Sequence, residues 1–243
     1  MKLDVVIAWY AQEDLWPLVA WGLNENRESI HRVLIVNDAR WTPAQRALLL
    51  ATMATYDAFP KHVLLEHKHE EFGSHRSIRQ GAQHVNTGWW VHIDGDIILA
   101  PGSLEALSNK PERGIMRCGV MHDVRRDLQV SDLANCPIER ADERLDKDVC
   151  DWVDVRDGYI FSHAQDYFAI GGHDLLYPDY GCCDYDIAMR WMMHFGEETI
   201  EMAPDAISYH LGGAHVQHPT DSRNLARFKR MAVAYCAWQQ AEE

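Results

Sequence analysis

Asp94-Gly95-Asp96 is the segment of the sequence best suited to chemistry. It follows the apolar run Trp89-Trp90-Val91-His92-Ile93, so two carboxylates stand at the end of a predicted buried strand. Carboxylate oxygens bind hard divalent cations together with phosphate groups, and an intervening glycine lets a ligand come close to the backbone. The pattern indicates a site for a divalent cation and a nucleoside diphosphate. A plain Asp-Gly turn after a strand is the alternative.

Asp184 lies in a second candidate segment. From Asp186 onward, Ile187, Trp191 and Phe195 recur at four-residue spacing and predict a helix. Amide dipoles at a helix start favour a carboxylate over its acid form. Asp184 is therefore expected to stay ionised and able to accept a proton from an attacking hydroxyl group. A purely structural helix cap is the alternative.

The first half of the chain alternates strand and helix signals, which predicts an α/β fold with a Rossmann-like, mostly parallel sheet and helices on both faces. Ligands in such sheets bind outside the carboxyl ends of the strands. Tyr10, Asp38 and Asp94 follow three of the predicted strands and are expected to face one crevice. The predicted elements are strands at 3–8, 33–36, 62–65 and 89–93, and helices at about 15–23, 42–56 and 74–85.

Composition limits the possible functions. The 243 residues, 47% of them hydrophobic, are expected to form a single domain, and the formal charge of −14 argues against a mainly electrostatic hold on nucleic acid or an anionic membrane. No signal-peptide pattern and no long apolar run is present, so a soluble, cytoplasmic protein is expected. The six cysteines show no zinc-ligand spacing and are expected to be reduced. A helix is also expected from about 221 to 238, as a packed closing helix.

Two later segments carry a more specific pattern. These are Phe168-Ala169-Ile170-Gly171-Gly172-His173-Asp174 and Tyr180-Gly181-Cys182-Cys183-Asp184-Tyr185-Asp186, the second followed by Arg190. Together with Asp94-Gly95-Asp96 as a DxD motif, they resemble the glycosyltransferases of the GT-A fold, and most closely the large family 2 of inverting enzymes. The resemblance covers most of the chain. It implies a nucleotide-sugar-binding half at about 1–100 and a mixed acceptor-binding and catalytic half at about 101–243.

The resemblance also implies a reaction, in which a sugar moves from a nucleotide-sugar donor to an acceptor hydroxyl with inversion. It favours a UDP-sugar donor and assigns Asp184 as general base. Asp96 would be the direct metal ligand, with Asp94 nearer the ribose and the metal's waters. His210 would be a second ligand, with His215 and His218 as rivals, and an imidazole ligand favours Mn²⁺ over Mg²⁺.

Further site residues follow from matching the family's segments. Asp38 would contact the base of the nucleotide, beside Tyr10, and Arg76 or Arg79 would reach the donor diphosphate, because a guanidinium suits that bidentate task. Gly73 and Gly81 match two family glycines that lie eight residues apart. The expected acceptor side consists of Tyr180, Gly181 and Asp186. Cys183 stands where the family has a glutamate, and only Tyr10 of the first-strand segment matches.

Three alternatives remain from the sequence: a retaining GT-A enzyme, a non-catalytic module that binds sugar nucleotides or glycans, and a nucleotidyltransferase. The last does not account for the segment from Gly171 to Asp184. The acceptor is not disclosed, and a glycan, a lipid-linked sugar, a small molecule, a protein and a modified nucleic acid are all open.

Overall fold

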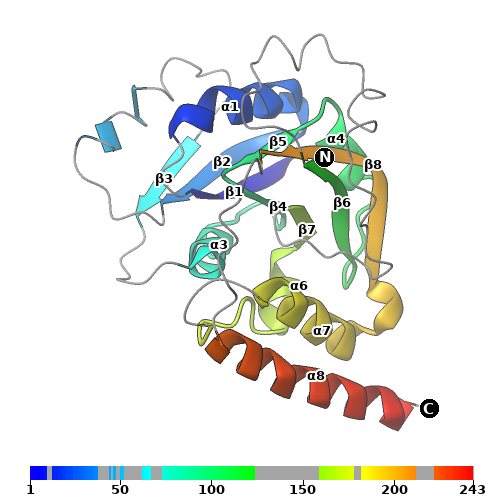
Figure 1. Cartoon of the computed structure of the whole chain (residues 1–243). Coiled ribbons are helices and arrows are strands. Elements are labelled where there is room, and N and C mark those ends of the chain that lie inside the picture. The colour runs from blue at the N-terminus through cyan, green and yellow to red at the C-terminus, as the bar shows by residue number, and fades with distance from the viewer. Residues whose placement is uncertain are drawn as a thin grey trace.

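The computed structural model describes residues 1–9, 13–37, 44, 46–47, 50–51, 62–66, 73–123, 159–177, 182–211 and 222–242. Its centre is an eight-stranded sheet in the order β3-β2-β1-β4-β7-β6-β8-β5 (Figure 1). The strands are β1 (Leu3–Trp9), β2 (Ile30–Asn37), β3 (His62–Glu66), β4 (Trp89–Asp94), β5 (Ile97–Leu99), β6 (Met116–Asp123), β7 (Tyr159–His163) and β8 (Ile200–His210).

Helices cover both faces of this sheet, as the sequence predicted. The main helices are α1 (Trp16–Glu25), α3 (Ser74–Ala82), α4 (Ser103–Leu107), α6 (Ala164–Ala169), α7 (Cys183–Phe195) and α8 (Ser222–Glu242). Short 3-10 helices lie at Glu13–Leu15, Arg27–Ser29 and Glu197–Thr199. In Figure 1, α1 lies on one side of the sheet and α3, α6 and α7 lie on the other.

The first half of the sheet is parallel. β1 pairs in parallel with both β2 and β4, and β2 pairs in parallel with β3. Apolar runs such as Val33–Val36 are buried on both faces, which is why these strands read as continuous hydrophobic stretches rather than as alternating ones. The four predicted strands are therefore confirmed, and their carboxyl ends lie at one edge of the sheet.

The second half is mixed. β7 is antiparallel to β4 and β6, β8 is parallel to β6, and β5 is antiparallel to β8. β5 begins three residues after β4 ends, yet it stands four places away from β4 in the sheet. Four strand spacings measure about 19 Å, whereas three extended residues reach only about 10 Å. The sheet must therefore curl, so that β5 returns to the end of β4.

Each face has its own apolar core. On the α1 face, Trp9 and Trp16 are fully buried, with ring centroids 5.3 Å apart in an edge-to-face arrangement. On the opposite face, Trp90 and Tyr167 meet in the same way at 5.0 Å, and the fully buried Trp191 belongs to the same cluster. The aromatic residues at these positions therefore form the core.

Gly81 lets α3 pack closely on the sheet. A Cβ atom added at this glycine would lie 2.3 Å from Cγ1 of Val6 on β1 and 3.1 Å from Cγ2 of Val36 on β2. The first separation is far below van der Waals contact and the second is tight, so a side chain here would push the helix away. Packing is thus the physical role of one of the two glycines singled out in the sequence.

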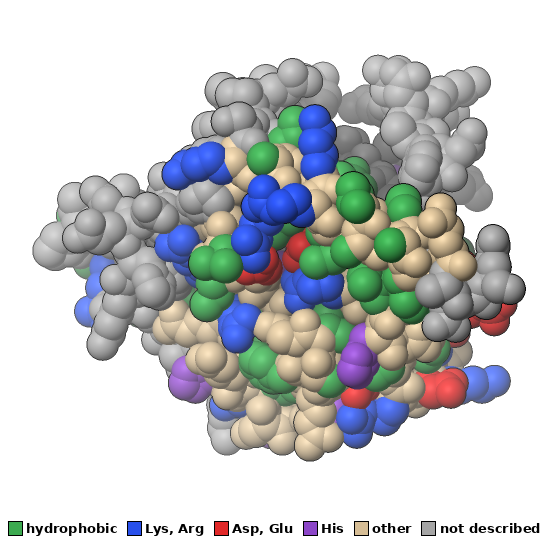
Figure 2. Space-filling view, turned by 90° about the horizontal axis from the view of Figure 1, so that it is seen from below, with side chains coloured by type: hydrophobic (Ala, Val, Ile, Leu, Met, Phe, Trp, Pro, Cys, Tyr) green, Lys and Arg blue, Asp and Glu red, His purple; other side chains and the backbone are tan. Residues whose placement is uncertain are grey.

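The C-terminal helix α8 packs on α7, as expected for a closing helix. Rings of Tyr185 and Phe228 lie 5.9 Å apart, and the Tyr235 hydroxyl donates to Glu197 Oε1 at 3.1 Å. Figure 2 views the molecule from the α8 side and shows Lys and Arg side chains gathered among hydrophobic ones. Within the described residues, no helix is long and apolar enough to cross a membrane.

Candidate active site

Asp96 and His210 are brought together by the pairing of β5 with β8. Ile97 stands opposite His210 in the antiparallel register, and the Leu211 amide donates to the Asp96 carbonyl at 2.9 Å. His210 Nε2 lies 3.6 Å from Asp96 Oδ2, and the two side chains are only 15% and 14% exposed. Two predicted metal ligands that are far apart in the sequence thus converge in the structure.

The Asp96–His210 pair suits a divalent cation. Carboxylate oxygen and imidazole nitrogen are ligands that Mn²⁺ accepts, and a cation bound to a nucleotide takes its remaining ligands from phosphate and water. No group of three or more His, Cys, Asp or Glu side chains forms a metal site within the described ranges. Asp96 and His210 could therefore supply two ligands to such a cation.

Asp94 ends β4 beside Ala8 of β1, at the carboxyl edge of the parallel strands. Its Oδ1 lies 3.3 Å from Nε2 of His92, and the His92 side chain is 1% exposed whereas that of Asp94 is 40% exposed. A buried imidazole thus backs the more exposed carboxylate. The sequence analysis did not assign His92 a role, although its two-residue spacing from Asp94 places both side chains on the same face of the strand.

Asp184 lies in the first turn of α7, as predicted. The helix begins at Cys183 rather than at Asp186, and the residue before it, Cys182, takes the N-cap position with a left-handed φ of 67°. Asp184 therefore lies close to the helix N-terminus. The residue is half-buried, so part of it remains accessible to solvent. Burial, and then the charges of Asp184 and Asp186, raise the pKa of the Cys182 thiol. The described cysteines are free thiols, so Cys182 and Cys183 form no bridge.

Asp186 is almost fully buried and is hydrogen-bonded both within α7 and to Tyr177. Its Oδ2 accepts hydrogen bonds from Arg190 Nε at 2.8 Å and Nη2 at 2.5 Å, and its Oδ1 accepts one from the Tyr177 hydroxyl at 3.2 Å. Burial, followed by the charge of Asp186, raises the pKa of Tyr177. These contacts give Asp186 a structural position, and direct acceptor binding by this residue stays a prediction.

The Gly171-Gly172 turn requires its glycines. Their φ angles are +86° and +64°, a region that side chains disfavour, and a Cβ atom at Gly172 would lie 2.8 Å from the Tyr167 ring. The Tyr167 hydroxyl lies 2.8 Å from His173 Nδ1 and also accepts from the His173 amide at 2.9 Å. The turn is therefore packed tightly onto α6.

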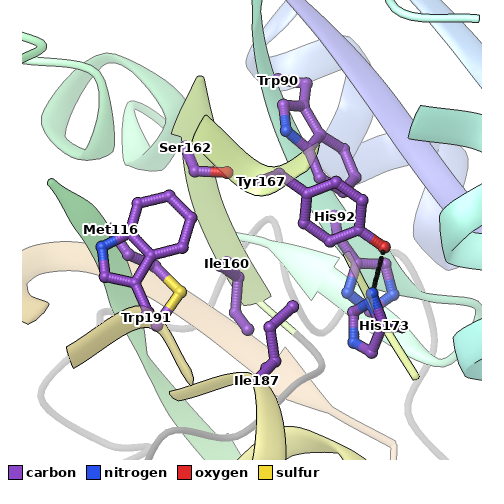
Figure 3. A pocket seen from close by; sticks show the side chains of 9 residues that line it. All are labelled: Trp90, His92, Met116, Ile160, Ser162, Tyr167, His173, Ile187 and Trp191. Atoms are coloured by element: carbon purple, nitrogen blue, oxygen red, sulfur yellow. Dashed lines mark hydrogen bonds between the residues drawn. The ribbon is translucent and has the colours of Figure 1, made fainter. Parts of the chain in front are cut away.

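A small cavity lies beneath this turn, on the face of the sheet that α6 and α7 cover (Figure 3). Its polar lining residues are His92, Ser162, Tyr167 and His173, and Trp90 and Trp191 are among its apolar walls. The centres of water-sized molecules can occupy about 10 Å³ of it, which is room for about one water molecule. It is much too small for a nucleotide sugar, so it is not the donor site.

The predicted phosphate ligands on α3 have different surroundings. Arg79 Nη1 donates to the Gly171 carbonyl at 2.5 Å and to the His173 carbonyl at 2.9 Å. Arg76, one turn earlier on the same helix, is half-buried. Arg79 is thus held by the acceptor-side turn, which the sequence did not indicate, and phosphate binding by either arginine stays a prediction.

Several predicted site residues lie outside the described residues. They are Tyr10 and Asp38 at the ends of β1 and β2, Tyr180 and Gly181 before α7, and His215 and His218 after β8. Their roles remain predictions from the sequence. Asn37, which directly precedes Asp38, is buried and ends β2 opposite Trp9.

No family model and no curated protein matches the sequence, but solved structures resemble the fold. The mannosyltransferase PcManGT from Pyrobaculum calidifontis, in complex with GDP-Man and Mn²⁺, matches with a TM-score of 0.64 and 15% identity, covering 96% of this chain and 64% of that chain. GalNAc-T7 with UDP, GalNAc and Mn²⁺ matches at 0.67 and 12%, covering 98% and 50%. S. aureus TarS 1-349 in complex with UDP-GlcNAc matches at 0.62 and 11%, covering 98% and 66%.

The chain has the GT-A fold. This confirms the fold class predicted from the sequence. At 11–15% identity the likeness concerns the GT-A fold alone, and the chain spans only half to about two thirds of the length of these proteins. Membership of family 2 and the inverting mechanism stay predictions.

Proposed function

We propose that this GT-A protein is a metal-dependent glycosyltransferase that moves a sugar from a nucleotide-sugar donor to an acceptor hydroxyl. The observation that carries the proposal is the convergence of Asp96 and His210, 3.6 Å apart, beside the carboxyl edge of the parallel strands. Support comes from similar structures of this fold, whose complexes contain GDP-Man or UDP together with Mn²⁺.

In the proposed mechanism, Asp96 and His210 would hold Mn²⁺, or Mg²⁺, when the donor is bound. A bound cation of this kind supplies neutralisation of the charge that develops on the leaving diphosphate. Asp94, with His92 behind it, lies beside the pair and would accept hydrogen bonds from the ribose and from water. The buried His92 imidazole, 3.3 Å from Asp94 Oδ1, would limit the orientations of this carboxylate, so that less order has to be gained when the donor binds.

Asp184 is the proposed general base. An acceptor hydroxyl attacks the anomeric carbon from the face opposite the diphosphate, and Asp184 removes its proton as the new bond forms. Asp184 lies in the first turn of α7 and is only half-buried, which would let an acceptor approach it. Attack from the face opposite the diphosphate would give inversion at the anomeric carbon.

The donor proposed first is a UDP-sugar, with Tyr10 and Asp38 at the base and Arg76 at the diphosphate. The similar structures contain both uridine and guanosine nucleotides, so the test must include both. On the acceptor side, Tyr180 and Gly181 precede the Cys182-Cys183-Asp184 segment in the chain and would contact the acceptor. The class of acceptor is left to experiment.

The test is release of nucleoside diphosphate from a panel of UDP- and GDP-sugars, with Mn²⁺ or with a chelator. Slow hydrolysis of the donor needs no acceptor, so the assay does not depend on knowing it. We expect metal-dependent release from one donor, reduced at least tenfold in Asp96→Asn. Asp205→Asn is the matched control, since it removes one negative charge at an exposed position of β8, the strand that carries His210.

Two outcomes would count against the proposal. No release and no metal-dependent binding of any donor would favour a non-catalytic module. Equal loss in Asp96→Asn and Asp205→Asn would mean that overall charge, not a metal ligand, is responsible. Once a donor and an acceptor are known, NMR of the product's anomeric proton separates inversion from retention.

A further inference from the structure

The four consecutive carbonyl groups of residues 170–173 all accept hydrogen bonds from two arginine side chains. Arg190 Nη1 donates to the first and third, at 2.8 and 2.7 Å. Arg79 Nη1 donates to the second and fourth, at 2.5 and 2.9 Å. The two guanidinium groups thus take alternate carbonyls of one tight turn, the turn that contains Gly171 and Gly172.

The two arginines come from different halves of the molecule. Arg79 lies on α3, which packs through Gly81 against the strands of the nucleotide-binding half. Arg190 lies on α7, the helix whose first turn carries Asp184, and its other nitrogens are fixed by the buried Asp186. The turn is therefore a junction between the expected donor side and the helix of the candidate base.

Arginine is the residue suited to this junction. A turn with two left-handed glycines forms no regular ladder, so its carbonyl oxygens need other donors. A guanidinium is planar, always charged and donates in several fixed directions, and charged donors make stronger hydrogen bonds than neutral ones. An ammonium group in the same place is a point charge without that fixed fork.

We propose that Arg79 and Arg190 are positioning residues, a double-arginine clamp that fixes the 170–173 turn and so sets the distance between Asp184 and the bound donor. The clamp rests on the proposed function, because only the proposed function gives Asp184 a role as base. It assigns Arg79 to the turn, whereas the sequence assigned it to the donor diphosphate. Loss of the clamp would misplace the base without removing a donor contact, and displacements of about 1 Å can cost about a hundredfold in rate.

Kinetics of donor hydrolysis separate these two roles of Arg79. In Arg79→Met, which keeps the apolar stem but has no donors, we expect kcat to fall at least tenfold while KM for the donor stays within twofold. Arg79→Lys should recover part of kcat. A raised KM with unchanged kcat would show that Arg79 binds the diphosphate, and would overturn the clamp.

Arg117→Met is the matched control. Arg117 is similarly half-buried and donates to two backbone carbonyls, those of Asn109 and Lys110, as well as to Glu201, but its partners lie in the connection before β6 and on β8. We expect its kcat and KM to match those of the native protein. A loss of kcat equal to that of Arg79→Met would mean that any arginine–carbonyl contact matters equally, and would also overturn the clamp.

Hydrogen exchange supplies a readout that does not depend on activity. The amides of Gly171, Gly172 and His173 are hydrogen-bonded to α6, so they exchange only when the turn opens. We expect Arg79→Met and Arg190→Met to speed exchange at these amides at least tenfold, and Arg117→Met to leave it unchanged. Unchanged exchange in both clamp variants would overturn the clamp. An inactive native protein would instead overturn the proposed function, and the exchange result would then decide whether the two arginines hold the turn.

Discussion

Asp96 and His210 are each about one-seventh exposed, and this degree of burial matters for the proposed chemistry. A carboxylate at such a site has lost much of its hydration, and charges there interact more strongly than in bulk water. A cation that arrives with a diphosphate therefore gains more from Asp96 than from a fully exposed carboxylate. Asp94, at 40% exposure, keeps more water and suits contacts to ribose hydroxyls.

Asp184→Asn tests the base at the scale of one residue. The amide keeps the size of the side chain but cannot accept the acceptor's proton, and general-base catalysis contributes roughly 10²- to 10⁴-fold. We expect kcat for sugar transfer to fall within that range, with the Kd of the donor unchanged in calorimetry. A variant that keeps its kcat would remove Asp184 from the mechanism.

Sequence reasoning could predict positions only for residues whose type alone suggests chemistry, and their roles stay predictions. Asp94, Asp96 and Asp184 stand at a strand end or a helix start, where local pattern fixes their position, and His210 follows a short apolar segment. The contacts of His92 and Arg79 were not predicted. The two-residue spacing of His92 from Asp94 is a local signal that the sequence analysis did not use. The carbonyls of Gly171 and His173 reach Arg79 only through tertiary contact, which no local pattern encodes.

Among the secondary-structure elements, the parallel strands were the most predictable and β5 the least. Continuous apolar runs mark β1, β2 and β4, which are buried on both faces. β5 is only three residues long, so periodicity cannot reveal it, and its place at the sheet's far edge follows from pairing with β8. The observed start of α7, Cys183, lies three residues before the predicted one, because the apolar stripe that revealed the helix begins only at Ile187, one turn later.

Gly81→Ala tests the packing of α3 on the sheet. Alanine favours a helix over glycine by about 1 kcal/mol, but its Cβ would lie 2.3 Å from the buried Val6 side chain, and overpacking a core costs typically 1–3 kcal/mol. We expect the clash to dominate and the free energy of unfolding to fall, as measured by urea denaturation. Gln80→Ala adds no atom toward the sheet and should change it by less than about 0.5 kcal/mol; a Gly81→Ala protein as stable as the native one would disprove this packing role.

For the whole molecule, donor and metal binding should appear as stability. A ligand at 100 times its Kd stabilises the folded state by about 2.7 kcal/mol, and each kcal/mol raises the Tm of a protein of this size by about 2–4 °C. We expect the nucleoside diphosphate released in the donor assay to raise Tm by roughly 5–10 °C with Mn²⁺ in calorimetry. The increase should disappear with chelator and in His210→Ala; an equal increase without metal would exclude a bridging cation.

The curled sheet also has a consequence for synthesis on the ribosome. Asp96 leaves the ribosome before its partner His210 and the strand β8 that pairs with β5, which follow more than a hundred residues later. The nascent chain therefore carries only one of the two proposed cation ligands, and an unpaired β5, while the second half of the sheet is still being made. The proposed metal site cannot be completed before β8 is made, so it would form late, after the parallel strands have had time to fold.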